Sequence, residues 1–201
     1  MQRKWSNYLF VITLLFFSLG FVNIIFALFG FVCLIVPFIL LFKDRKKTWC
    51  QQYCPRSRLF TVATKGRSLS GKAGPDWLAK GKAKWFFLVY FAINILMITM
   101  STIRVANGLM APVEKVRFLI FIFLPWKLPQ FLNLGQASDW VVHLSYRIYS
   151  MMFTTTVIGL LLGLLFMPRT WCRVCPINTL SDIGLKNKKT ESVVGLKENL
   201  S

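Results

Sequence analysis

Four of the five cysteines fall in two matched motifs. Cys50 and Cys54 stand in Thr48-Trp-Cys-Gln-Gln-Tyr-Cys-Pro55, and Cys172 and Cys175 stand in Thr170-Trp-Cys-Arg-Val-Cys-Pro176. Each motif follows an apolar block, begins with Thr-Trp and ends with Cys-Pro. If the two motifs converge, they supply four thiolates, the ligand set of a tetrahedral metal ion or a cubane iron–sulfur cluster.

Positive and aromatic side chains flank these cysteines. A cluster held by four thiolates is anionic, so neighbouring cations would offset its charge and raise its reduction potential. We therefore predict that the cofactor is surrounded by six further side chains, which are Lys47, Trp49, Arg56, Arg169, Trp171 and Arg173. The proline after each pair stops the preceding helix and turns the chain along the membrane surface.

Other uses of paired cysteines remain open. A structural zinc site takes the same ligands, and a membrane thiol–disulfide exchanger also carries cysteine pairs. The fifth cysteine, Cys33, lies inside an apolar run, where a free thiol behaves as a small hydrophobic side chain. We interpret Cys33 as a packing residue.

The composition is that of a membrane protein. Of 201 residues 55% are hydrophobic, the mean hydropathy is +0.55, and the net charge of +18 lies between apolar blocks. This pattern argues against a soluble nucleic-acid-binding domain. The 19 Phe residues exclude a disordered chain, and the 5 Cys residues are too sparse for a secreted disulfide scaffold. A single His excludes a multi-histidine metal site within this chain.

Three apolar blocks predict four membrane-spanning helices. Residues 8–42 carry no charge, and as one helix they would extend about 52 Å against a hydrocarbon core of about 30 Å. A helical hairpin that turns at Gly20 and Asn23 fits better. Residues 85–103 and 149–167 each supply one further span, and Gly159 and Gly163 in the last one have a spacing typical of close helix packing.

The segment between the last two blocks is predicted to lie outside the membrane. Its apolar stretch 116–124 contains Arg117 and is too short to span, so we expect an interfacial or re-entrant segment with Trp126 and Trp140 as interface anchors. His143 is interpreted as a surface or interface side chain. A quinone contact or a haem shared with a partner is the alternative for this residue.

The distribution of positive charge favours four crossings. Residues 1–7, 43–84 and 168–201 hold 2, 12 and 6 Lys and Arg, whereas 104–148 holds 5. The positive-inside rule then places both termini and both motifs in the cytoplasm, at the cell membrane. The predicted fold is an all-α integral membrane protein of two pseudo-repeated helix pairs, each followed by a Cys-Pro motif, divided at residues 1–84 and 85–201.

The two motifs resemble those of membrane-bound 4Fe–4S binding proteins of the polyferredoxin type. This group includes membrane ferredoxin-like subunits of nitrate reductase systems and the membrane part of nitrous-oxide-reductase maturation proteins. The resemblance rests on Trp49-Cys-Gln-Gln-Tyr-Cys-Pro55 and Trp171-Cys-Arg-Val-Cys-Pro176. Many members carry a Gly soon after Cys-Pro, where this chain has Arg56-Ser57 and Ile177-Asn178, and larger members append a soluble ferredoxin domain.

The resemblance implies electron transfer between the cytoplasm, the membrane and an outside partner. We predict one [4Fe–4S] cluster held by the four motif cysteines, within a larger oxidoreductase. A cytoplasmic ferredoxin or flavodoxin, steered by the basic 43–84 loop, would exchange electrons with a quinone or a cofactor-bearing membrane or extracytoplasmic redox subunit. Nucleic acid is not an expected partner. The alternatives are a non-enzymatic anchor or assembly subunit with structural zinc, or a membrane thiol–disulfide oxidoreductase.

Overall fold

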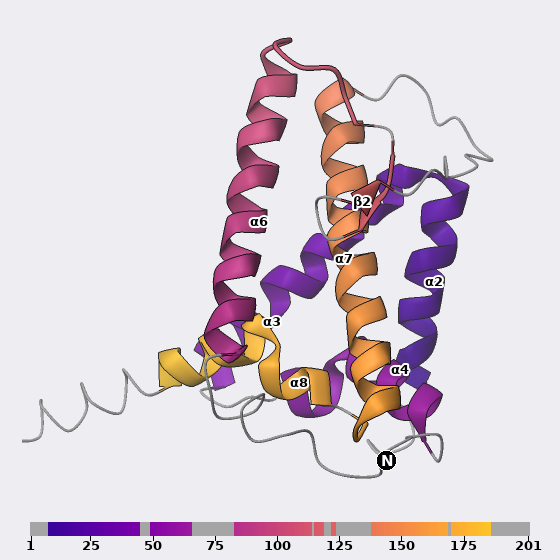
Figure 1. The fold of residues 1–201 in the computed structure, drawn as a ribbon, viewed down its shortest axis with the longest axis vertical. Coiled ribbons are helices and arrows are strands. Elements are labelled where there is room, and N and C mark those ends of the chain that lie inside the picture. The colour runs from indigo at the N-terminus through magenta and orange to yellow at the C-terminus, as the bar shows by residue number, and fades with distance from the viewer. Residues whose placement is uncertain are drawn as a thin grey trace, which may run out of the picture.

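The computed structural model describes residues 8–44, 49–65, 83–113, 115–118, 122–123, 138–168 and 170–185. Lys47, Arg169 and Trp126, all singled out by the sequence, lie outside these residues. The described part is mostly helical. Figure 1 shows α6 (Ala83–Ala106), α7 (Asp139–Leu165) and α2 (Leu9–Val22) standing upright, with α7 between the other two, while α3 (Gly30–Asp44) crosses obliquely.

The predicted hairpin in the first apolar block turns at Asn23. Its extended backbone (φ −155°, ψ 132°) ends α2, and its side chain accepts the backbone N–H of Ile25 at 2.9 Å. A 3-10 helix, η2 (Ile24–Phe29), then leads into α3. The turn predicted at Gly20 is wrong, because Gly20 lies inside α2, where a Cβ would stand 2.3 Å from the ring of Tyr149. Gly20 therefore serves close packing.

Three helical segments in the described ranges are long and apolar enough to cross a membrane. They are Ile24–Asp44, α6 and α7. α2 is also apolar, but its 14 residues extend only about 21 Å, less than the hydrocarbon core of about 30 Å. The structure thus gives three spanning candidates, and the predicted count of four crossings and the pseudo-repeat stay predictions.

The last long helix begins ten residues earlier than its apolar block. α7 starts at Asp139 instead of Tyr149, so the end of the predicted external segment is helical. The hydropathy pattern missed these ten residues because some of their polar side chains are enclosed by protein, as Ser145 is. Trp140, on the first turn of α7, is 45% exposed. Trp140 is thus accessible at the end of a helix, where we predicted an interface anchor.

The expectation that His143 is a surface side chain is wrong. His143 is fully buried, its Nδ1 accepts the backbone N–H of Val113 at 3.1 Å, and its Nε2 lies 3.0 Å from the hydroxyl of Ser101. Ser101 donates its own proton to the carbonyl of Ile98 at 3.0 Å, so Nε2 is the donor of the His143–Ser101 pair. The ring joins α6, α7 and the loop at Val113 as a neutral imidazole.

A short hairpin departs from the predicted all-α fold. β1 (Arg117–Phe118) and β2 (Ile122–Phe123) pair antiparallel, with Arg117 opposite Phe123. β1 lies against α7, since the backbone N–H of Arg117 donates to the hydroxyl of Ser150 at 3.1 Å. Val116 is buried with Ile24 and Tyr149. The aromatic and β-branched residues of this segment suit a strand. Its interfacial or re-entrant placement stays a prediction.

Short helices gather where α7 ends. They are α4 (Pro55–Thr64), α8 (Thr170–Val174) and residues 176–185 (Figure 1). The packing role predicted for Gly159 and Gly163 is confirmed, because α4 lies directly on them. A Cβ on Gly159 would stand 2.4 Å from the Phe60 ring, and one on Gly163 would stand 3.1 Å from Thr64. The first cysteine motif lies directly before α4, and the second includes α8.

Candidate metal centre

All four motif cysteines line one cavity of about 70 Å³ at this end of the helices. The first pair comes from the segment after α3, and the second pair from the segment after α7. All five thiols of the chain are half-buried. The structure therefore brings Cys50, Cys54, Cys172 and Cys175 together around one space, as the convergence argument requires.

The first motif is wound as a π-helix, η3 (Trp49–Tyr53). The backbone N–H of Cys54 donates to the carbonyl of Trp49, five residues earlier, at 2.9 Å. Pro55 then occupies the first turn of α4, where a missing N–H costs nothing because that position has no helical acceptor. The chain thus changes direction at Cys54 and presents both cysteines to the cavity.

The second motif is one α-helical turn, α8. The backbone N–H of Cys175 donates to the carbonyl of Trp171, four residues earlier, also at 2.9 Å. Pro176 begins the helix over residues 176–185. Both motifs are therefore closed by the same bond, from the second cysteine to the tryptophan before the first. The π-helix accommodates the one additional residue of the first motif.

Each second cysteine stands at the start of a helix of ten residues. Such a helix end carries partial positive charge, which favours an anionic cofactor. Cys175 also caps its helix, because its sulfur interacts with the backbone N–H groups of Asn178 and Ile177. Burial raises the pKa of the Cys175 thiol, and these hydrogen bonds oppose that rise. A metal that binds here must replace the thiol proton.

Arg56 brings positive charge into the cavity wall. Its guanidinium donates to the hydroxyl of Thr155 at 2.8 Å and contacts the sulfur of Met152, both on α7. It lines the cavity and lies near enough to Cys175 to lower the pKa of that thiol. The sequence placed Arg56 near the cofactor, and the structure shows that α7 fixes its position.

The two tryptophans also line the cavity. Trp171 is buried and packs edge-on against Phe87 of α6, with ring centroids 5.3 Å apart. Arg173 differs from these residues: its side chain is exposed and does not belong to the cavity wall. The structure thus brings Trp49, Arg56 and Trp171 to the thiols and leaves Arg173 outside.

Cys33 is a fifth thiol in the same wall. It shares this wall with Cys54 and Arg56. The interpretation of Cys33 as a packing residue did not anticipate that it lines the same cavity as the motif cysteines. Its location halfway along an apolar run gave no sign that α3 passes beside the motifs, and a cysteine outside a motif carries no spacing signal.

The donor set fits an iron–sulfur cluster better than a single ion. Within the described ranges, no three Cys, His, Asp or Glu side chains lie close enough together to hold one metal ion. The thiols are instead distributed around a cavity. A cubane cluster needs this distribution, because each thiolate binds a different iron, whereas a zinc ion holds its sulfurs at about 2.3 Å from one centre.

Comparison with known families agrees with this chemistry. A family model described as a 4Fe-4S binding domain matches residues 26–72 and, separately, residues 149–191. The two matches support a 4Fe–4S binding protein. The first contains α3 and the first cysteine motif, and the second contains the second motif together with α7 from Tyr149 onward. Comparisons with curated proteins and with solved structures gave no match.

Proposed function

We propose that this chain is a membrane electron-transfer protein that holds one [4Fe–4S] cluster at the cytoplasmic face. The carrying observation is that the two cysteine pairs line a single cavity. Each motif supplies only two thiols, so neither region matched by the family model contains four cysteine ligands by itself. One shared cluster uses all four motif cysteines, whereas two clusters would each lack cysteine ligands.

The surrounding residues would stabilise such a cluster. When bound, it supplies one-electron transfer. Arg56 and the N-terminal ends of α4 and of residues 176–185 offset negative charge, and the backbone N–H groups at Ile177 and Asn178 hydrogen bond to a ligand sulfur. Hydrogen bonds to the sulfurs and nearby positive charge both raise the reduction potential.

We further propose that the chain relays electrons from a donor in the cytoplasm to a quinone or a redox partner. A ferredoxin or flavodoxin in the cytoplasm is the donor, and a quinone or a cofactor-bearing redox subunit is the acceptor. The 12 Lys and Arg residues of the 43–84 loop support this orientation through the positive-inside rule, and they would attract an acidic donor. Both termini are then cytoplasmic, which requires α2 and its flanking residues to complete a fourth crossing.

Metal analysis tests the cofactor. The full chain, purified without oxygen in detergent, should contain four iron and four sulfide per chain and a broad visible absorbance that dithionite bleaches. Eight iron per chain would overturn the shared cluster. A colourless protein that contains zinc would support the anchor or assembly alternative, and redox-active disulfides without metal would support the thiol–disulfide alternative.

Salt dependence tests the relay. Reduced ferredoxin, mixed with the loaded protein, should bleach the cluster at a rate that falls as salt rises, because the Debye length is only about 8 Å at physiological ionic strength. A rate that does not change with salt would exclude steering by the basic loop. Labelling of introduced cysteines in intact cells tests topology: Ser138→Cys should react from outside, whereas Ser70→Cys and Ser192→Cys should not.

A further inference from the structure

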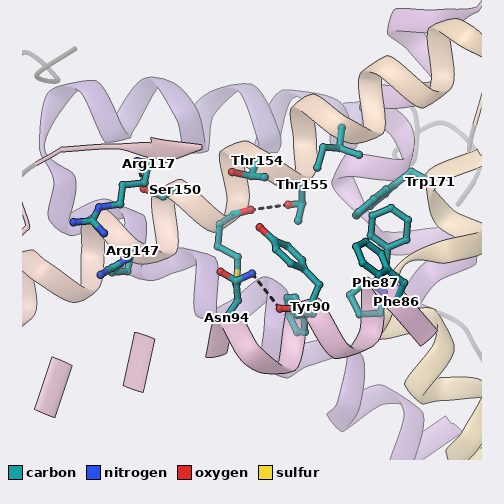
Figure 2. A pocket seen from close by; sticks show the side chains of 14 residues that line it. Phe86, Phe87, Tyr90, Asn94, Arg117, Arg147, Ser150, Thr154, Thr155 and Trp171 are labelled. Atoms are coloured by element: carbon teal, nitrogen blue, oxygen red, sulfur yellow. Dashed lines mark hydrogen bonds between the residues drawn. The ribbon is translucent and has the colours of Figure 1, made fainter. Parts of the chain in front are cut away.

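A second cavity, of about 120 Å³, lies between α6 and α7 (Figure 2). It is separate from the thiol cavity but shares part of its wall. Five residues line both spaces, namely Phe91, Met151, Thr155, Trp171 and Pro176. Trp171 directly precedes Cys172, and Pro176 directly follows Cys175. A molecule in the second cavity would therefore lie one residue away from two of the proposed cluster ligands.

The second cavity is an aromatic slot with a cationic end. α6 contributes the rings of Phe86, Phe87 and Tyr90, and Trp171 stands beside them. Arg147 and Arg117 lie at the opposite end in Figure 2. Along α7 the wall runs from Arg147 to Ile158, about 16 Å at 1.5 Å per residue. The slot is thus long enough for a ring system.

The polar groups of this cavity mostly use their protons within the protein. The hydroxyl of Ser150 donates to the carbonyl of Tyr146, Thr155 donates to Met151, and the Asn94 amide donates to Tyr90. Arg147 is different, because its Nε is buried without a hydrogen-bond partner. Among the described residues that line the cavity there is no carboxylate. A complementary ligand therefore brings hydrogen-bond acceptors and a flat apolar body.

We propose that this cavity binds the ring of a membrane quinone, with a carbonyl oxygen accepting a hydrogen bond from Arg147. A quinone ring carries acceptors but no donors, and it stacks on aromatic side chains. Ionisable groups inside membrane helices commonly mark functional sites. The inference rests on the proposed function, since it identifies the acceptor. In turnover the quinone gains two electrons, delivered singly from reduced ferredoxin, and two protons from water, and it leaves as quinol.

Photolabelling tests the location. The full chain in phosphatidylcholine nanodiscs is exposed to an azido-quinone, illuminated and digested. We expect labelled peptides from residues 86–94 and 147–158, and competition by unlabelled quinone should remove the label. Label that lies elsewhere, or that resists competition, would overturn the proposal. Replacing part of the phosphatidylcholine by phosphatidylglycerol should leave the label unchanged; if the anionic lipid displaces the quinone, the slot is a lipid site.

Variants test the interaction. Arg147→Gln should weaken quinone binding on the order of tenfold, because it removes a charged donor. Thr154→Leu fills the slot from a second position and should weaken binding as well. Arg104→Gln is the matched control, since Arg104 is exposed in the last turn of α6 and does not line the cavity. Normal quinone binding in both Arg147→Gln and Thr154→Leu, or equal loss in Arg104→Gln, would contradict the proposed site.

Iron content separates this inference from the proposed function. Each preparation is assayed for iron before labelling, which also reports whether a variant has folded. Iron-loaded protein without quinone binding would overturn the inference and leave the cluster proposal intact. Iron-free protein that still labels at residues 86–94 and 147–158 would overturn the cluster proposal and leave the quinone site in place.

Discussion

The two cysteine motifs reach the same end point by different windings. In the first, the N–H of Cys54 bonds to Trp49 through a π-turn, and in the second the N–H of Cys175 bonds to Trp171 through an α-turn. Because both are closed by the bond from the second cysteine to the tryptophan, Cys-x3-Cys and Cys-x2-Cys are structurally equivalent here. The two motifs share this hydrogen bond, although the number of residues between their cysteines differs.

The helices after the two motifs are held differently. α4 lies on the glycines of α7 through Phe60 and Thr64, so the first motif depends on close packing between helices. The helix at 176–185 is capped by the sulfur of Cys175 itself, whereas the side chain of Cys54 makes no such bond to α4. The first motif therefore depends on distant residues of α7, and the second depends more on its own backbone.

Removing a ligand should have the largest effect. Changing any one of the four motif cysteines to Ser should remove most of the iron, because each supplies one thiolate to a shared cluster. Cys33→Ser is the control: it alters the same cavity wall without removing a predicted ligand, and iron should be retained. Iron and sulfide analysis with electron paramagnetic resonance measures the result. Full iron content after a loss in only one motif would contradict shared ligation.

Changing the length of the first motif tests whether its π-turn is needed to place the thiols. Deleting Gln52 converts Cys-x3-Cys to Cys-x2-Cys and forces the π-turn toward an α-turn, which rotates Cys50 by about 100° relative to Cys54. We expect iron content to fall severalfold. Gln52→Ala keeps the length and should keep the iron. If the deletion variant loads normally, the π-turn has no part in placing the thiols.

Filling the glycine surface tests the dependence of the first motif on α7. Gly159→Ala places a methyl group against the Phe60 ring and should destabilise the protein by about 1–3 kcal/mol, seen as a lower Tm in detergent. Gly184→Ala is the matched control from the second helix. Its Cβ would meet only Leu41 at 3.7 Å, so its effect should stay within about 1 kcal/mol. Equal melting shifts would argue against a special role of this surface.

The sequence predicted those features that a local pattern encodes. Matched motifs predicted the convergence of four thiols, and the Gly159–Gly163 spacing predicted close packing. Features that depend on distant contacts were missed. Gly20 was assigned to a turn because its contact with Tyr149, far along the chain, leaves no local signal. His143 was placed on the surface because its partners, Ser101 and Val113, belong to other segments.

Contacts between distant residues also decide which of the predicted arginines reaches the site. Arg56 was predicted near the cofactor from its position after Cys-Pro, but its partners Thr155 and Met152 lie almost a hundred residues later. Arg173, between two cysteines, is also predicted near the cofactor, but its side chain is exposed in the structure. Sequence proximity to a ligand therefore does not decide which cation reaches the cavity. The packing of α4 on α7 makes that difference.

These two arginines give the smallest and most specific effect. Arg56→Gln should lower the reduction potential of the cluster on the order of 50 mV, because a nearby cation stabilises the more negative, reduced state. Arg56→Lys keeps the charge and should restore most of this loss, although it cannot keep the paired contacts to Thr155 and Met152. Arg173→Gln should shift the potential much less, since water screens an exposed charge. Redox titration followed by electron paramagnetic resonance measures all three variants. Equal shifts for Arg56→Gln and Arg173→Gln would mean that a position in the cavity wall does not strengthen the effect of an arginine on the reduction potential. A potential unchanged in both variants would exclude both arginines as determinants of the potential.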